Sequence, residues 1–179
     1  LDDGLGKLLA AIDSLALADN TYIIYMSDNG SVPNIPGAKQ YEESYNYPLS
    51  RGKWDAMEGG IRVPLIIRGP GVAPGMESTV PVSGTDILPT IGDLAAHKVQ
   101  EFKAIDGGSF KEALLHNRSE AVERAVEGLV FHVPYRNGIA LKRPHSALRM
   151  GDFKLLKFQD NDESLLFNLT SDIGENRDV

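Results

Sequence analysis

The sequence predicts an α/β fold followed by a small antiparallel β-sheet. Apolar residues near the N-terminus recur at helical spacing, and a short turn then leads into an uninterrupted apolar run. From about residue 126 onward, short strand-like segments alternate with turn residues. With 179 residues, of which 42% are hydrophobic, the chain can build a core. We therefore expect an α/β part over residues 1–125 and an antiparallel subdomain over residues 126–179.

The first predicted element is an amphipathic helix, with Asp2 or Asp3 as its N-terminal cap. Its apolar positions are Leu5, Leu8, Leu9, Ile12 and Leu15. A turn at residues 18–20 leads into residues 21–26, whose continuous apolar character favours a parallel strand covered on both faces.

The middle of the chain contains a long excursion from this sheet. Residues 30–52 show no sustained periodicity, and loops of this length in a compact domain are usually functional. Residues 63–67 form the next predicted strand, and residues 78–82 read as a further extended segment. A helix is expected over residues 86–96, with Asp86 as its cap and Pro89 in its first turn.

Four short segments predict the antiparallel sheet. Turn residues separate them, including Gly151 and Asp152 at the tip of an expected hairpin. The segments are residues 128–133, 146–150, 153–158 and 164–169.

Composition excludes several function classes. The net charge is −7 and no block of lysine and arginine is present, which argues against nucleic acid as a partner. The absence of cysteine excludes disulfides, thiolate metal sites and cysteine nucleophiles. No window approaches the roughly 18 consecutive apolar residues of a membrane span.

Asp28 and Asn29 lie just beyond the predicted strand at residues 21–26, after Ser27. Open α/β sheets bind ligands just beyond the carboxyl ends of their strands, and calcium and magnesium prefer oxygen donors of this kind. The alternative is a simple Asx turn, because Asp-Asn-Gly is common turn chemistry. Calcium takes about six to eight oxygens, so other residues would have to complete any site.

Lys53 lies in a glycine-rich segment, between Gly52 and the acidic residues Asp55 and Glu58. It could be a surface lysine in an ion pair with one of them. Alternatively, its ammonium could stabilise the charge that develops on a sulfuryl or phosphoryl oxygen. The four histidines (His97, His116, His132 and His145) show no metal-ligand spacing and are interpreted as structural or surface residues.

Taken together and in order, these segments resemble the C-terminal half of the sulfatase family. The matching segments are Asp3-Gly-Leu-Gly6, Leu17-Ala-Asp-Asn-Thr21, Ser27-Asp-Asn-Gly30, Gly52-Lys53, Glu58-Gly-Gly-Ile-Arg-Val-Pro64, Thr85-Asp-Ile-Leu-Pro-Thr90, Asp106-Gly107 and Ala147-Leu-Arg-Met-Gly-Asp-Phe-Lys-Leu156. The resemblance extends through residues 166–169 and 172–176. It implies part of an alkaline-phosphatase-like α/β sheet with flanking helices, followed by the small antiparallel subdomain.

The resemblance also implies roles for individual residues. Asp28 and Asn29 match two calcium ligands of a sulfatase, with magnesium as the second choice of ion. Lys53 matches the lysine that contacts the sulfate ester near its bridging oxygen. In such enzymes a formylglycine hydrate attacks sulfur while the metal and cations stabilise the developing charge. The family also suggests a periplasmic or secreted location and a sulfated sugar or aryl sulfate as substrate.

The formylglycine motif of the family, Cys or Ser followed by x-Pro-x-Arg, is absent. Residues 31–35 begin as Ser-Val-Pro but end in isoleucine, and they follow Asp28 and Asn29 instead of preceding them. Asp2 and Asp3 do not match the N-terminal acidic metal ligands of the family either. We therefore expect the nucleophile to lie in a missing N-terminal half and the chain alone to be inactive. We also expect the chain to depend on that half, or on self-association, to cover its apolar surfaces.

Two alternatives remain at this point. One is a phosphate or phosphonate monoester hydrolase of the same superfamily, and the other is a noncatalytic module that retains the fold. The substrate is not encoded in a recognisable pattern, although Tyr41, Tyr45 and Tyr47 could stack on a sugar or aryl ring. They could equally pack on Trp54.

Overall fold

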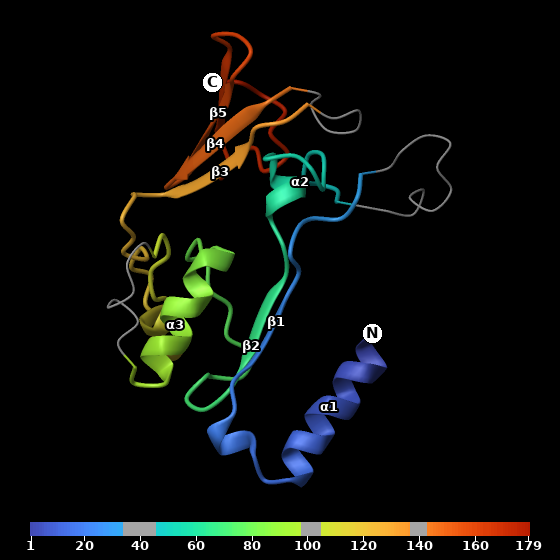
Figure 1. Cartoon of the computed structure of the whole chain (residues 1–179), viewed down its shortest axis with the longest axis vertical. Coiled ribbons are helices and arrows are strands. Elements are labelled where there is room, and N and C mark those ends of the chain that lie inside the picture. The colour runs from blue at the N-terminus through green and yellow to red at the C-terminus, as the bar shows by residue number, and fades with distance from the viewer. Residues whose placement is uncertain (34–45, 98–104, 137–142) are drawn as a thin grey trace.

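The computed structural model describes residues 1–33, 46–97, 105–136 and 143–179. Two sheets organise these residues (Figure 1). The helices are α1 (Asp2–Ser14), α2 (Glu58–Ile61), α3 (Ile87–Leu94) and α4 (Lys111–His116), with short 3-10 helices at Ala18–Asn20 and Gly84–Asp86. The strands are β1 (Ile23–Met26), β2 (Leu65–Arg68), β3 (Leu129–Val133), β4 (His145–Met150), β5 (Phe153–Phe158) and β6 (Ser164–Asn168).

Strands β1 and β2 form a two-stranded antiparallel sheet, in which Ile24 pairs with Ile67 and Met26 with Leu65. The expectation of parallel pairing for residues 21–26 is wrong for this neighbour. Burial on both faces is also wrong, because Met26 is exposed and no residue of β1 is fully buried among the described parts of the chain. The continuous apolar run marks a strand but carries no information about the direction of its neighbour.

Helix α1 forms where the apolar spacing predicts it, yet Asp2 and Asp3 lie inside its first turn and neither side chain caps it. None of its residues is buried. An ion pair between Asp13 and Arg68 of β2, 2.6 Å long, connects the helix to the sheet. Carboxylates in a first turn still interact favourably with the positive end of the helix dipole.

The four predicted C-terminal strands form an antiparallel sheet in the order β3-β4-β5-β6. Gly151, with φ of +56°, lies in the tight β4–β5 turn, as the sequence predicts. One face of the sheet carries the buried side chains Ala147, Leu156, Phe158 and Phe167. Ala56 and Met57, which precede α2, pack into the same core, so the sheet is joined to a segment about a hundred residues earlier in the chain.

Residues 78–82 form neither a helix nor a strand. Val80 and Val82 instead pack against a second apolar core built around α4, whose buried members are Phe110, Ala113, Leu114 and Val122. Within the described residues, no helix is long and apolar enough to cross a membrane.

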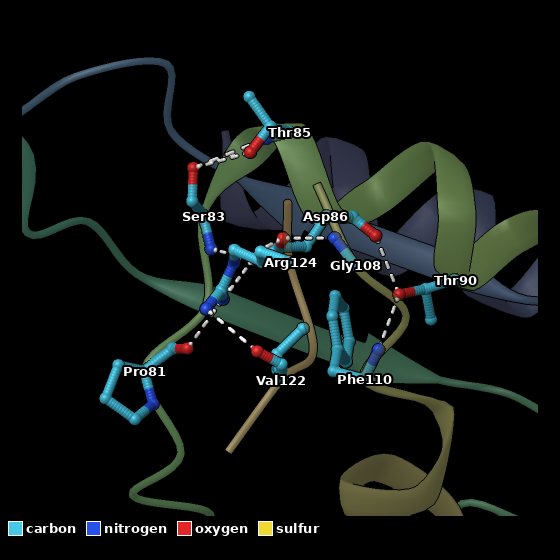
Figure 2. A network of polar contacts seen from close by, with 9 residues as sticks. All are labelled: Pro81, Ser83, Thr85, Asp86, Thr90, Gly108, Phe110, Val122 and Arg124. Carbon is cyan, nitrogen blue, oxygen red and sulfur yellow. Dashed lines mark hydrogen bonds and ion pairs between the residues drawn. The ribbon is translucent and has the colours of Figure 1, made fainter. Parts of the chain in front are cut away.

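Asp86 is the N-cap residue of α3 by position, as the sequence predicts, but its side chain has a different role. Its carboxylate is completely buried and makes no cap hydrogen bond to that helix. It accepts hydrogen bonds from the Ser83 and Gly108 amides and forms a 2.7 Å ion pair with Arg124 (Figure 2). The Asp86 backbone carbonyl accepts a bond from Thr90 Oγ1, which in turn accepts from the Phe110 amide. The buried Asp86 carboxylate therefore holds together three segments around α3, which contain Ser83, Gly108 and Arg124.

Replacing Arg124 by methionine should lower the free energy of unfolding by about 3 kcal/mol or more, because the Asp86 carboxylate would stay buried without its cation. The matched control is Arg118→Met, since the Arg118–Glu112 pair is about half exposed and should cost less than about 1 kcal/mol. Urea unfolding of both variants measures the difference. Equal stability losses would contradict the structural role of Arg124.

Candidate functional site

Asp28 and Asn29 follow β1 after the single residue Ser27, at the strand end where the sequence places them. The Asp28 carboxylate is exposed, and in the described residues no hydrogen bond or ion pair engages it. Asn29 Nδ2 donates a hydrogen bond to the Gly30 carbonyl at 3.0 Å. This bond uses the nitrogen of the side-chain amide and not its oxygen, which can therefore accept another partner. Two oxygen donors from adjacent residues are thus available at the end of one strand.

The segment after Asn29 lies directly against the segment that carries Lys53. The Gly30 amide donates to the Gly60 carbonyl at 2.9 Å, and the Lys53 amide donates to the Ser31 carbonyl at 3.0 Å. A Cβ atom on Gly30 would lie 1.7 Å from the Gly59 carbonyl oxygen, so only glycine allows this approach. The backbone therefore brings together the two parts of the site that the sequence separates by more than twenty residues.

Lys53 is half-buried, and its ammonium lies 5.8 Å from the centroid of the Trp54 ring. Among the described residues Lys53 forms no ion pair with Asp55 or Glu58. Asp55 instead contacts Arg51 and His145, and Glu58 contacts Arg62 and Lys154. Trp54 has φ of +78°, which is rare for a bulky residue and is often found at functional sites. The Lys53 ammonium is thus not neutralised by the neighbouring carboxylates.

Glu58, at the start of α2, belongs to a completely buried charge cluster. Lys154 Nζ on β5 lies 3.1 Å from Glu58 Oε1 and 2.7 Å from Glu175 Oε1. Glu175 Oε2 also accepts the Glu58 backbone amide at 2.6 Å. Burial raises the pKa of Glu175 above its ordinary value, although the Lys154 charge acts in the opposite direction. The half-exposed Arg62 adds a weaker contact to Glu58 at 3.5 Å.

His145 of β4 holds the same segment at a second point. Its Nδ1 lies 2.8 Å from the Arg143 carbonyl, and its Nε2 accepts the Ala56 amide at 3.0 Å, a pattern that fits the neutral ring with the proton on Nδ1. Burial lowers the pKa of His145, but the Asp55 carboxylate and the Arg143 carbonyl raise it by more, so the net shift is upward. The expected structural role of this histidine fits its complete burial.

The donors present fit calcium in kind but not in number. Asp28 and Asn29 offer the carboxylate and amide oxygens that hard cations take. Among the described residues, no group of three or more His, Asp and Glu side chains could hold a metal ion. The two donors can therefore form only part of a calcium shell, and further oxygens would have to come from elsewhere.

The tyrosines singled out from the sequence contribute little to this geometry. Tyr41 and Tyr45 lie outside the described residues. Tyr47 is 82% exposed, so it does not pack on Trp54 as a loop core.

Sequence reasoning missed the buried partners behind the site, which are Glu58, His145, Lys154 and Glu175. The available signal was the placement of Glu58, Lys154 and Glu175 inside three of the matching segments, and such a match does not reveal which residues face each other.

Two family models match the chain in overlapping segments. Residues 1–97 match the sulfatase family, and residues 53–179 match the C-terminal part described as N-sulphoglucosamine sulphohydrolase, C-terminal. The chain belongs to the sulfatase family. The first match contains Asp28 and Asn29, both contain Lys53, and the second contains the whole four-stranded sheet.

Individual relatives agree with this assignment. Steryl-sulfatase of Rattus norvegicus is 34% identical over 82% of the chain, which spans 25% of that protein. The solved structure of BT4656 with its substrate D-glucosamine-2-N,6-O-disulfate superposes with a TM-score of 0.75 at 26% identity, over 99% of this chain and 33% of that one. A phosphonate monoester hydrolase from Silicibacter pomeroyi shares the fold, with a TM-score of 0.71 at 22% identity over 99% of this chain and 34% of that one. The sulfatase chain thus spans between a quarter and a third of these relatives.

Replacing Gly30 by alanine should lower the free energy of unfolding by about 2 kcal/mol or more, because the new methyl group would meet backbone that cannot move aside without breaking the Gly30–Gly60 hydrogen bond. Gly6→Ala in α1 is the matched control. No atom lies within 4 Å of a Cβ at Gly6, and alanine should stabilise the helix by up to about 1 kcal/mol. Denaturant unfolding compares the two, and a neutral Gly30→Ala would contradict the close approach.

Proposed function

We propose that the chain is the C-terminal part of a sulfatase that hydrolyses sulfate esters by a calcium-assisted formylglycine mechanism. The observation that carries the proposal is the backbone pairing of residues 30 and 31 with residues 53 and 60, which brings the Lys53 segment against the segment that follows Asp28 and Asn29. On this proposal, residues 1–125 complete the catalytic α/β domain and residues 126–179 form a small subdomain behind it.

Each residue has a distinct role in this proposal. Asp28 and Asn29 would hold part of the calcium shell, and calcium would supply positive charge to the sulfate oxygens. Lys53 would place its ammonium near the bridging oxygen of the ester and stabilise the negative charge of the departing alkoxide. The nucleophile would come from outside these 179 residues, since the formylglycine motif is not in the sequence.

A sulfated sugar is the first substrate to test. BT4656, a relative of 26% identity over 99% of the chain, was solved with a sulfated glucosamine, whereas the steryl-sulfatases suggest a different leaving group. Phosphonate monoester hydrolysis is the second candidate, favoured by the shared fold of the Silicibacter pomeroyi enzyme. A noncatalytic binding module is the third, and it predicts no turnover of either ester.

Lys53→Ala in a protein that carries the complete sulfatase domain should lower kcat for a sulfate ester by about 10²-fold or more, because a charge aimed at the leaving oxygen acts mainly in the transition state. Lys7→Ala is the control, since Lys7 is exposed on α1 and pairs only with Asp3 among the described residues. Steady-state kinetics with sulfate and phosphonate esters decides between the hydrolases.

Equal activity of the Lys53→Ala and Lys7→Ala variants would contradict the catalytic role of Lys53.

The isolated 179-residue chain should show no sulfatase activity. Calcium-dependent turnover of an aryl sulfate by that chain alone would contradict the placement of the nucleophile elsewhere.

A further inference from the structure

The strongest unexplained feature of the molecule is the buried cluster of Lys154, Glu58 and Glu175. Each of the three side chains is at most 1% exposed. Buried charges are costly to desolvate, and replacing such a cluster by apolar residues often leaves stability unchanged or improves it. The stability of the four-stranded sheet therefore does not by itself explain why the Lys154 ammonium is buried in its core.

The cluster joins elements that are distant in sequence. Lys154 lies on β5 and Glu175 follows β6, whereas Glu58 begins α2, 96 residues before Lys154. Figure 1 shows α2 beside the C-terminal sheet, at the end of the β1–β2 pair. The charges thus connect the sheet to the segment that carries Lys53.

From Glu58 the connection continues through the backbone to both parts of the candidate site. Gly60, two residues along α2, accepts the hydrogen bond of the Gly30 amide behind Asn29. Gly59 donates to the Ser50 carbonyl, and Lys53 donates to the Ser31 carbonyl. A shift of Glu58 would therefore move the segments of Lys53 and of Asp28 and Asn29 together.

We propose that Lys154 is a positioning residue of the site: by binding Glu58 and Glu175 it fixes residues 52–60, so that Lys53 and the Asp28–Asn29 pair keep their mutual geometry. This inference rests on the proposed function for its catalytic consequence. Lys154 touches no reacting group and acts through Glu58 and through Glu175, which accepts the Glu58 amide.

The test compares Lys154→Met with Lys157→Met, both on β5, in a protein that carries the complete sulfatase domain. Lys157 is about half exposed, with a 3.7 Å contact to the exposed Asp162, so it is the matched control. Lys154→Met should lower kcat by about 10²-fold with a smaller change in KM, because misplacing a catalytic group by about 1 Å has an effect of this size. Lys157→Met should behave as wild type.

Amide hydrogen exchange supplies a readout that does not depend on turnover. Lys154→Met should speed exchange at Gly30, Lys53 and Gly59 by about tenfold or more, relative to Arg124→Met. Arg124→Met is the control for general destabilisation, since the Asp86–Arg124 hydrogen bonds go to residues between Pro81 and Arg124. If the Lys154→Met variant does not fold, the double variant Lys154→Met with Glu175→Gln takes its place in both assays. The second substitution removes one of the two carboxylates that lose their cation.

Unchanged exchange at these three amides, or equal acceleration in Arg124→Met, would overturn the proposal. Wild-type kcat in Lys154→Met would also overturn it. If the wild-type protein turns over no sulfate ester, the proposed function fails, and the exchange rates still decide whether Lys154 fixes the segment.

Discussion

The ion pairs of Lys154 with Glu58 and Glu175 are the interaction on which the candidate site depends most. They place one positive charge between two carboxylates, and each of the three side chains is at most 1% exposed. Losing the lysine would leave two buried charges uncompensated, and breaking such clusters usually costs about 3–5 kcal/mol. The small sheet therefore contributes to the site, because its inner strand β5 supplies the cation that binds Glu58 in the Lys53 segment.

Around this cluster, backbone contacts do most of the positioning. Gly30, Gly59 and Gly60 allow backbone segments to meet at distances that a side chain would prevent. His145 adds a hydrogen bond to the Ala56 amide. Asp28 and the Lys53 ammonium remain free of strong partners in the described residues, which suits the metal-binding and anion-binding roles that we propose for them. The buried Asp86–Arg124 pair plays the corresponding structural part around α3.

Sequence patterns predicted the local elements well because their signals are local. The strand end at Asp28 and Asn29, helix α1 and the four C-terminal strands follow from apolar spacing and turn residues. The direction of β1 relative to β2 did not follow, since a continuous apolar run is equally compatible with either pairing. Asp86 takes the predicted N-cap position of α3, but the partner of its carboxylate did not follow from the sequence, because Arg124 lies 38 residues away.

Strand β5 shows most clearly why the buried cluster could not be predicted. Its sequence, Phe-Lys-Leu-Leu-Lys-Phe, offers two lysines of equal apparent exposure. In the structure Lys154 faces the core, while Phe153 and Leu155 are 47% and 39% exposed. The burial of Lys154 becomes intelligible only once Glu58 and Glu175 lie opposite it, and those contacts span 96 and 21 residues of sequence.

A double-mutant cycle of Lys154→Met and Glu58→Gln tests the central claim most directly. The free energies of unfolding of the wild type, the two single variants and the double variant give the coupling between the two side chains. A direct buried ion pair predicts that the two losses are strongly non-additive, with a coupling of about 1–3 kcal/mol. Additive losses, with a coupling near zero, would contradict the account that Lys154 holds the Lys53 segment through Glu58.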